Sequence, residues 1–465
     1  MWLIVLCCIL PWLAGGIAAN LFCAPAPHKT GHTPLLFGIG GLLGTIGAAL
    51  LTIMATWVGV SLLKPWPLIA LGLIVVVSAI RLTKFWPTHR SQLSGNTPQL
   101  RVITLMSFAL ISAIAAINAW HAAWVPTTSW DSLWYWVEIA KHFIEATQAE
   151  PITGWLHNET HPSTVAIVST WAATHLPRTA GMGASYFSWW LIWLSIVLTV
   201  YGCTEALTAN RNTSALVAAA SASMPLLTNH ALLGGYAEIF LSAGVAGATA
   251  LLTLSLKEHS RGLALLGLIL AVSCITLKNT GFIFGGCVLL GYLVCLAINH
   301  GFGKWLIGLM AVLALGAGLL VIMVSEQTIS FEIASRQLTL KLTNAPFIFR
   351  NELISLFYNA SFSITALLLL APIMIFGSTY GRQKNTELAS LLMPWVTSLI
   401  LMGMLCASQL TDYGFLYAIP GNDTGNSRLA LPLMVCTLLI VGPLWALVSN
   451  KDRRLSFQTK ATADR

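Results

Sequence analysis

Residues 236–256 read YAEIFLSAGVAGATALLTLSL, a run of apolar and small side chains in which Glu238 is the single charged residue. A helix needs roughly 20 apolar residues to cross the hydrocarbon of a bilayer, so this run predicts a membrane-spanning helix with a carboxylate at one membrane face. About thirteen segments of this kind follow one another along the chain. The predicted spans are 1–22, 34–62, 65–83, 103–124, 184–207, 213–229, 236–256, 261–277, 282–298, 305–325, 353–377, 387–408 and 428–449.

The composition indicates the same fold class. Of the 465 residues, 56% are hydrophobic and only 9% are charged, which leaves too few charges to cover the surface of a water-soluble protein of this size. The formal net charge of +8 does not indicate nucleic-acid binding, because the basic residues are scattered in short clusters beside apolar segments. We therefore expect an all-α, polytopic transmembrane helical bundle surrounded by membrane lipids.

The positions of the basic residues predict an orientation. With the spans above, the connections that carry most of the Lys and Arg residues all fall on one side, which should be the cytoplasm because positive charge is retained there. The opposite, external side then receives the loops 125–183, 326–352 and 409–427 and two short turns near Gly235 and Lys278. The basic residues that define the cytoplasmic side are Arg81, Lys84, Arg90, Arg211, Lys257, Arg261, Lys304, Arg382, Lys384, Lys451, Arg453 and Arg454.

The external loop 125–183 departs from the pattern of plain spanning helices. Its first part, 131–147, places apolar side chains along one helical stripe and charged ones opposite, which predicts an amphipathic helix lying in the membrane interface. Its second part, 162–176, is apolar but short and is followed by Pro177. We expect an interfacial or half-inserted helix there, because the segment is too short for a full span.

Two residue types have structural rather than chemical interpretations. The eighteen tryptophans are typical of the bilayer interface, where an indole keeps its ring in an apolar layer and its N–H in a wet one. Most of the nine cysteines lie inside or beside apolar runs without C-x-x-C spacing, so we expect them to be small packing residues.

Polar clusters recur at the predicted external face, at the start or end of an apolar helix. A charge at the edge of the hydrocarbon needs a partner, a ligand or open water, and the convergence of several such charges favours a functional site. The four clusters are Trp130-Asp131, His161-Pro162, Gly235-Tyr236-Ala237-Glu238 and Lys278-Asn279-Thr280-Gly281.

Each cluster also has a structural explanation. Asp131 can cap the interfacial helix, and Glu238 can oppose the helix dipole in the first turn of its span. Lys278 can extend its ammonium to lipid headgroups, although it lies on the side that is otherwise poor in lysine, which favours an anionic ligand. His161 before a proline is a common helix start.

Taken together and in this order, the clusters resemble the membrane-embedded GT-C glycosyltransferases, which include protein O-mannosyltransferases and aminoarabinose transferases of lipid A. In that family an acidic residue in the first external loop precedes an amphipathic helix and a His-Pro-like helix start, and a second acidic residue follows two spans later. The matching segments in this sequence are Trp130 to Trp136, Lys141, His161-Pro162, Gly235 to Glu238 and Lys278 to Gly281. Arg428 to Pro432 is a weaker match.

The resemblance implies a division of the chain into N-terminal helices (1–102), a catalytic membrane core (103–298) and C-terminal helices (299–465). It also implies transfer of a hexosyl or pentosyl unit from a polyprenyl-phosphate donor to a protein, glycan or lipid acceptor of the cell envelope. The expected place is the periplasmic face of a bacterial inner membrane.

The resemblance further implies roles for individual residues. Asp131 and Glu238 are the expected catalytic carboxylates, and they are also the expected ligands if Mg²⁺ or Mn²⁺ binds, since both ions prefer hard oxygen ligands. The other expected site residues bind the donor phosphate or line the substrate cavity. The phosphate set is Lys278, Arg428, Tyr236 and Asn279, and the cavity set is His161, Lys141 and Trp130.

Two other classes of protein fit a chain with many spans. A transporter or flippase of a lipid-linked sugar would also carry a few intramembrane charges, although transporters tend to show repeated halves and broken helices near the midplane. An envelope polysaccharide polymerase or ligase would use similar chemistry, with its key basic residues mainly in 326–352. Arg336, Lys341 and Arg350 are the candidates there, beside the simpler interpretation of a solvated amphipathic surface.

Overall fold

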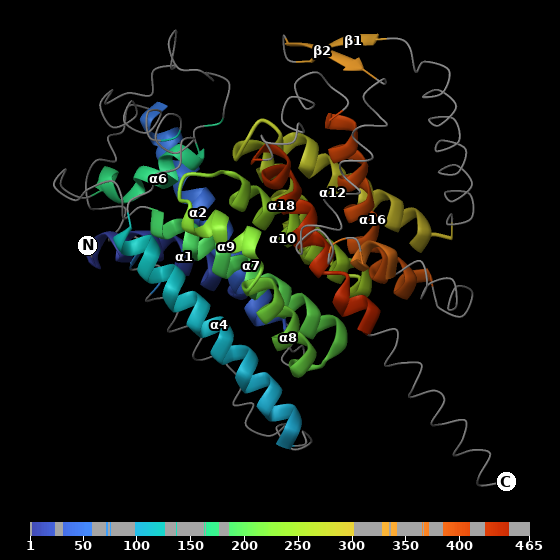
Figure 1. Cartoon of the computed structure of the whole chain (residues 1–465), viewed down its shortest axis with the longest axis horizontal. Coiled ribbons are helices and arrows are strands. Elements are labelled where there is room, and N and C mark those ends of the chain that lie inside the picture. Colours follow the sequence, from blue (N-terminus) through green and yellow to red (C-terminus); the bar gives the residue numbers. More distant parts are fainter. Residues whose placement is uncertain are drawn as a thin grey trace.

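A computed structural model describes more than half of the residues of the chain. The described residues are 2–23, 31–57, 71, 72, 75, 98–125, 136, 162, 164–175, 186–301, 328–333, 336–341, 365, 367–371, 385–409 and 424–445. Figure 1 shows their helices gathered into one bundle, with α10 in its middle.

Among the described residues, six helices are long and apolar enough to cross a membrane, which indicates a membrane protein. They lie in α2 (His32–Trp57), α4 (Pro98–Trp124), α7 (Phe187–Thr208), α10 (Glu238–Glu258), α12 (Gly281–Asn299) and α16 (Asn385–Gln409). Three shorter apolar helices accompany them. These are α1 (Trp2–Cys23), α11 (Arg261–Ser273), which continues into the single 3-10 turn η3 (Cys274–Thr276), and α18 (Thr424–Leu438). The predicted spans 65–83, 305–325 and 353–377 lie wholly or mostly outside the described residues.

Helix α10 is the central element of the bundle. All its residues from Glu238 to Leu256 are buried, and it packs against α7, α11, α16 and α18. Small residues allow close approach to α11 and η3, because a Cβ atom at Gly244 would lie 2.8 Å from the sulfur of Cys274. The hydroxyls of Ser242 and Thr249 each donate to the backbone carbonyl four residues earlier, so they remain hydrogen-bonded in an apolar core.

The predicted span 213–229 is two helices, not one. α8 (Arg211–Ala222) ends before Met224, and α9 (Pro225–Leu232) begins with a proline. A proline restricts the residue before it to extended backbone, and Met224 is extended, with φ −66° and ψ 117°. Pro225 therefore breaks the helix within the predicted span.

The described residues are mainly helical, as predicted, and one short segment is an exception. Within the predicted loop 326–352, β1 (Thr328–Ile333) and β2 (Arg336–Lys341) form an antiparallel hairpin. Its register pairs Ile329 with Leu340 and Ser330 with Thr339. The sequence TISFEI alternates apolar and polar residues, which is the period of a strand rather than of a helix or an irregular loop.

The short helix α6 (Thr164–His175) packs on α1 and α2. Its 12 residues rise by about 18 Å, which is too short to cross a bilayer and agrees with the expectation of a short helix.

A hydrogen bond from α6 compensates for a proline in α1. Pro11 in α1 has no N–H, so the carbonyl of Cys7 loses its usual partner within the helix. The indole of Trp171 in α6 donates to that carbonyl at 3.0 Å and replaces the missing bond.

Several tryptophans connect helices instead of lying at a membrane interface. Trp12 donates to the hydroxyl of Ser195 at 2.8 Å, and Trp190 donates to the carbonyl of Ala115 at 2.9 Å. The interface interpretation fits Trp120 and Trp124, which are exposed at the end of α4. The tryptophans buried inside the described bundle are Trp12, Trp136, Trp171, Trp189 and Trp193. Seven cysteines are buried free thiols, as expected of packing residues, and Cys406 is a half-buried one. The seven are Cys7, Cys8, Cys203, Cys274, Cys287, Cys295 and Cys436.

The bundle has two chemically distinct ends. One of them, here named the Arg211 end, holds the C-termini of α7 and α10 and the N-terminus of α2. The Nε of Arg211 lies 3.3 Å from the carboxylate of Glu205, and the Nε2 of His32 lies 2.9 Å from the carboxylate of Glu258. Lys257 donates to two carbonyls at the C-terminus of α7. The basic residues predicted to be cytoplasmic in this part of the chain therefore gather at one end.

Candidate functional site

The opposite end of α10, here named the Lys278 end, contains a partly buried ion pair. The Nζ of Lys278 donates to Oε1 of Glu238 at 2.7 Å, although the two residues are 40 positions apart. The side chain of Glu238 is 4% exposed and that of Lys278 is 20% exposed. Because α10 has 21 residues, this pair lies about 30 Å along the helix axis from Glu258 at the Arg211 end. Two of the four clusters identified in the sequence thus meet at one point.

The turn before α10 places Glu238, and glycine is required at two of its positions. Gly235 has a φ of +106°, a backbone conformation that only glycine adopts without strain. A Cβ atom at Gly234 would lie 2.4 Å from the ring of Tyr186, so the backbone of the turn packs directly on that ring. The two glycines let the chain reverse from α9 into α10 within a few residues.

Trp189 holds the same turn from α7. Its indole Nε1 donates to the carbonyl of Tyr236 at 2.9 Å, and its fully buried ring packs edge-on against Phe240, with centroids 5.0 Å apart. The ring of Tyr236 lies 5.8 Å from that of His230. The role of Trp189 could not be predicted from the sequence, because a tryptophan in an apolar run is a common membrane residue and nothing local shows where its N–H points.

A tight turn between η3 and α12 places Lys278. The N–H of Gly281 donates to the carbonyl of Lys278 at 2.7 Å. A Cβ atom at Gly281 would lie 1.8 Å from the carbonyl oxygen of Cys274, so only glycine fits where α12 begins. The hydroxyl of Thr280, at the N-cap of α12, is buried and makes no hydrogen bond within the described part of the chain. This turn also contains Asn279, which the resemblance described above predicts to bind the donor phosphate.

The backbone of Arg428 lies toward the Lys278 end. In α18 the sulfur of Cys436 lies 3.6 Å from the hydroxyl of Thr249, midway along α10. Further along the chain, a Cβ atom at Gly442 would lie 3.3 Å from Thr204, near the Arg211 end. The chain therefore runs from the Lys278 end to the Arg211 end here. Arg428 precedes Cys436 by eight residues (436 − 428), about 12 Å of helix toward the Lys278 end.

The remaining predicted site residues lie outside the described residues. They are Trp130, Asp131, Lys141 and His161. From the predicted amphipathic helix the structure describes only Trp136, which is buried in the core. The structure thus brings Glu238 and Lys278 together, with Tyr236 and Asn279 in the same two turns, and the meeting of Asp131 with Glu238 stays a prediction.

Glu238 fits a divalent metal poorly. One of its carboxylate oxygens already accepts from the ammonium of Lys278, and a second cation at this position would be repelled by that charge. Among the described residues, no group of three or more His, Cys, Asp and Glu side chains is placed to hold a metal ion.

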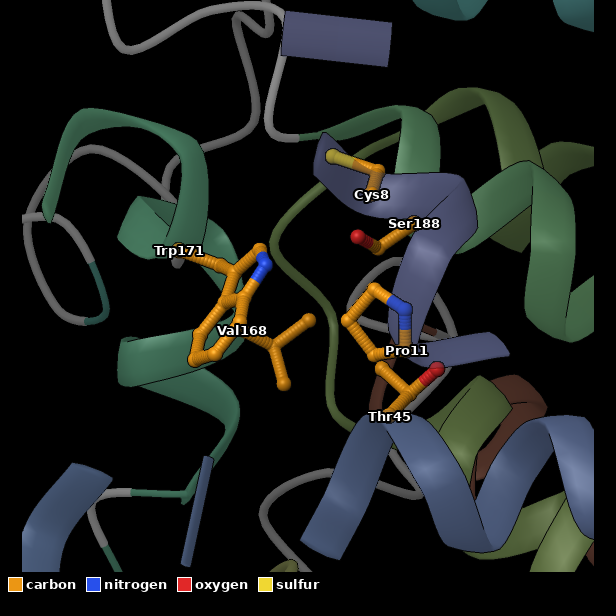
Figure 2. Close-up of a pocket in the computed structure, with 6 residues that line it drawn as sticks. All are labelled: Cys8, Pro11, Thr45, Val168, Trp171 and Ser188. Carbon is orange, nitrogen blue, oxygen red and sulfur yellow. The ribbon is translucent and has the colours of Figure 1, made fainter. Parts of the chain in front are cut away.

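A small cavity lies elsewhere in the bundle, between α1, α2, α6 and α7 (Figure 2). It is lined by Cys8, Pro11, Thr45, Val168, Trp171 and Ser188. Its volume is about 10 Å³, enough for at most one water molecule. A cavity of this size cannot accept a sugar or a lipid headgroup, so the ion pair at the Lys278 end is the better candidate for a site.

Comparison with known proteins adds no identification: no family model, no curated protein and no solved structure matches the chain.

Proposed function

We propose that the protein is a membrane glycosyltransferase that moves a sugar from a polyprenyl-phosphate donor to a cell-envelope acceptor at the external face. The observation that carries the proposal is the ion pair between Glu238 and Lys278 at one end of the bundle. A lysine that is held in place by a buried carboxylate, yet partly open, is suited to bind a phosphate at the membrane surface.

The chemistry needs two groups. The carrier phosphate leaves with negative charge, which a fixed cation stabilises, and the acceptor must lose a proton to a base. Lys278 supplies the cation in this proposal, and Arg428, whose helix runs toward the same end, supplies a second one. Asp131 is the proposed base, and Glu238 holds the donor-binding lysine. Transfer breaks the bond between the anomeric carbon and the phosphate oxygen and forms a bond to the acceptor oxygen.

The distribution of charge supports an enzyme over a transporter. Between Glu238 and Lys257, helix α10 contains no charged residue, so the centre of the bundle offers no charged midplane site along this helix. The described charged pairs lie at the two ends. A surface reaction needs charge at one face only, whereas a pathway for a charged cargo would need it through the bundle.

One observation favours a second candidate, a transporter or flippase of a lipid-linked sugar. The interruption between α8 and α9 at Met224 resembles the broken helices of transporters. Helix α9, eight residues long, connects this break to the turn that carries Glu238, so a movement of α9 would affect the same site.

A transfer assay tests the proposal. Purified protein in lipid discs is given polyprenyl-phosphate sugars one at a time, with peptide, glycan and lipid acceptors in separate reactions. Transfer of the sugar to any acceptor, with release of polyprenyl phosphate, is the expected result. Movement of an intact labelled donor across a vesicle membrane without transfer would instead establish the transporter.

A further inference from the structure

The two partners of the ion pair differ in their access to the surroundings. Glu238 belongs to the first turn of the fully buried helix α10, whereas a fifth of the Lys278 side chain is exposed. A carboxylate buried this deeply needs a compensating charge, and the ammonium provides it. An incoming molecule therefore meets Lys278, and Glu238 stays behind it.

The ammonium of Lys278 has N–H donors that Glu238 does not use. It carries three N–H groups, and one donates to Glu238. Within the part of the chain that the structure describes, the ammonium of Lys278 makes no other hydrogen bond. The remaining donors can bind an acceptor on the side of Lys278 away from α10. Nearby, the buried hydroxyl of Thr280 is a further donor.

We infer that Glu238 is a counter-ion that holds the ammonium of Lys278 in place, and that the phosphate of a polyprenyl lipid binds on the open side of that ammonium. This inference rests on the proposed function for the choice of lipid. It gives Glu238 neither a metal nor a proton to bind. Because a carboxylate next to a phosphate site repels the phosphate, the two residues should have opposite effects on phosphate binding.

Binding of polyprenyl monophosphate, measured on the full chain in lipid discs without any sugar, tests the inference. Lys278→Met should weaken binding roughly tenfold or more, because a hydrogen-bonded charge is lost. Glu238→Gln keeps the shape and an acceptor oxygen for the ammonium but removes the repelling charge, so its affinity should equal or exceed that of the native protein. A tenfold weaker affinity of Glu238→Gln would overturn the inference.

The exchanged pair, Glu238→Lys with Lys278→Glu, separates this role from a purely structural one. It restores opposite charges, so the melting temperature should recover relative to either single substitution, yet the affinity for polyprenyl phosphate should stay at least about tenfold weaker than native. Native affinity in the exchanged protein would show that the pair serves only to hold helices together. If the exchanged protein does not fold, the Glu238→Gln result alone decides.

Competition identifies the source of the phosphate. Inorganic phosphate should compete weakly with the polyprenyl probe in the native protein and not in Lys278→Met. Phosphatidylglycerol that competes as well as the probe itself would overturn the inference, since Lys278 would then be a general headgroup anchor. Because no sugar is present, a protein that binds as expected but fails the transfer assay would disprove the transferase and leave the phosphate site standing.

Discussion

Lys278 is the side chain whose removal should affect donor use most directly. A fixed charge on a leaving phosphate in a site poor in water can stabilise the transition state by a few kcal/mol, so Lys278→Ala should lower transfer by roughly 100-fold or more. Lys278→Arg should recover part of this, because the charge is kept while the geometry changes. The measurement is initial transfer rate at matched amounts of folded protein.

Lys257 provides the matched control for this substitution. It is also a lysine that makes hydrogen bonds, but it lies at the Arg211 end, where it donates to the carbonyls of Ala206 and Leu207. Lys257→Ala should leave transfer within a few-fold of the native rate. A Lys278→Ala protein that transfers sugar as well as this control would remove Lys278 from the site.

Trp189 should act through the turn that it holds. Trp189→Phe retains an aromatic ring beside Phe240 but leaves the carbonyl of Tyr236 without its donor, at a cost of about 1–3 kcal/mol. We expect a lower melting temperature and a lower kcat with little change in KM for the donor, because Glu238 and Lys278 are no longer held in register. Restoring an N–H donor by Trp189→His should recover part of the rate.

Trp190→Phe is the control, since Trp190 loses a similar hydrogen bond, to Ala115 in α4, away from the turn. A similar fall in melting temperature without a fall in kcat is expected. Equal kinetic losses in both variants would mean that Trp189 has no positioning role beyond general stability.

For single residues, the sequence indicates which charged side chains belong to the site, but it does not indicate which residues hold them in position. Glu238 and Lys278 stand out in the sequence because charges at helix ends are costly in a membrane and need a partner or a ligand. That the two residues are each other's partners was not predicted and is known from the structure. Trp189 and Gly281 do not stand out. Their contribution depends on which backbone atom of another helix lies opposite, and that is a property of the packed structure alone.

Among the elements, the approach of α12 to η3 should depend on Gly281. Gly281→Ala brings a methyl group against the carbonyl of Cys274, and backbone cannot move aside cheaply, so the turn that carries Lys278 must shift. We expect a clear fall in melting temperature together with weaker phosphate binding. Thermal unfolding in detergent and the polyprenyl phosphate binding assay measure the two effects.

The same helix contains its own control. Gly286 also lies in α12, and a Cβ atom there would meet nothing within 4 Å. Gly286→Ala should be neutral or slightly stabilising, because alanine has the higher helix propensity. If Gly281→Ala behaves like Gly286→Ala, the close contact with Cys274 does not determine the position of Lys278.

The element boundaries show where pattern reasoning works and where it fails. The ends of α10 and α12 fall within two residues of the predicted spans 236–256 and 282–298, because long apolar runs have few alternatives. The break at Pro225 was missed because the apolar run continues through it. The hairpin 328–341 was missed because its alternating residues were assigned to a solvated loop.

For the whole molecule, orientation is the property that decides the proposal. Leu233 and Arg261 are both exposed and lie at the Lys278 and Arg211 ends. A cysteine at Leu233 should react with a membrane-impermeant thiol reagent added to intact cells, and a cysteine at Arg261 should react only after the cells are opened. The native chain is the background control. The reverse pattern would place the ion pair in the cytoplasm and exclude an external transferase.

The sorting of charges into two ends could be predicted from the sequence, because the positive-inside rule acts on whole connections rather than on single contacts. The way in which the helices pack could not. Glycines at the crossing of α1 and α2 bring Gly15 so close to Gly40 that a Cβ atom would lie 2.0 Å from its carbonyl oxygen, and no hydropathy pattern identifies the partner of a glycine.

The proline in α1 has a consequence for how the protein is made. The carbonyl of Cys7 is released by Pro11, and its donor, Trp171, is 164 positions later in the chain. On the ribosome, α1 is therefore complete long before α6 exists, and an unpaired carbonyl in hydrocarbon is costly. We therefore expect the first helix to remain at a wet or protein-lined site of the insertion machinery until α6 arrives. A helix too short to span the membrane thus completes the assembly of the first one.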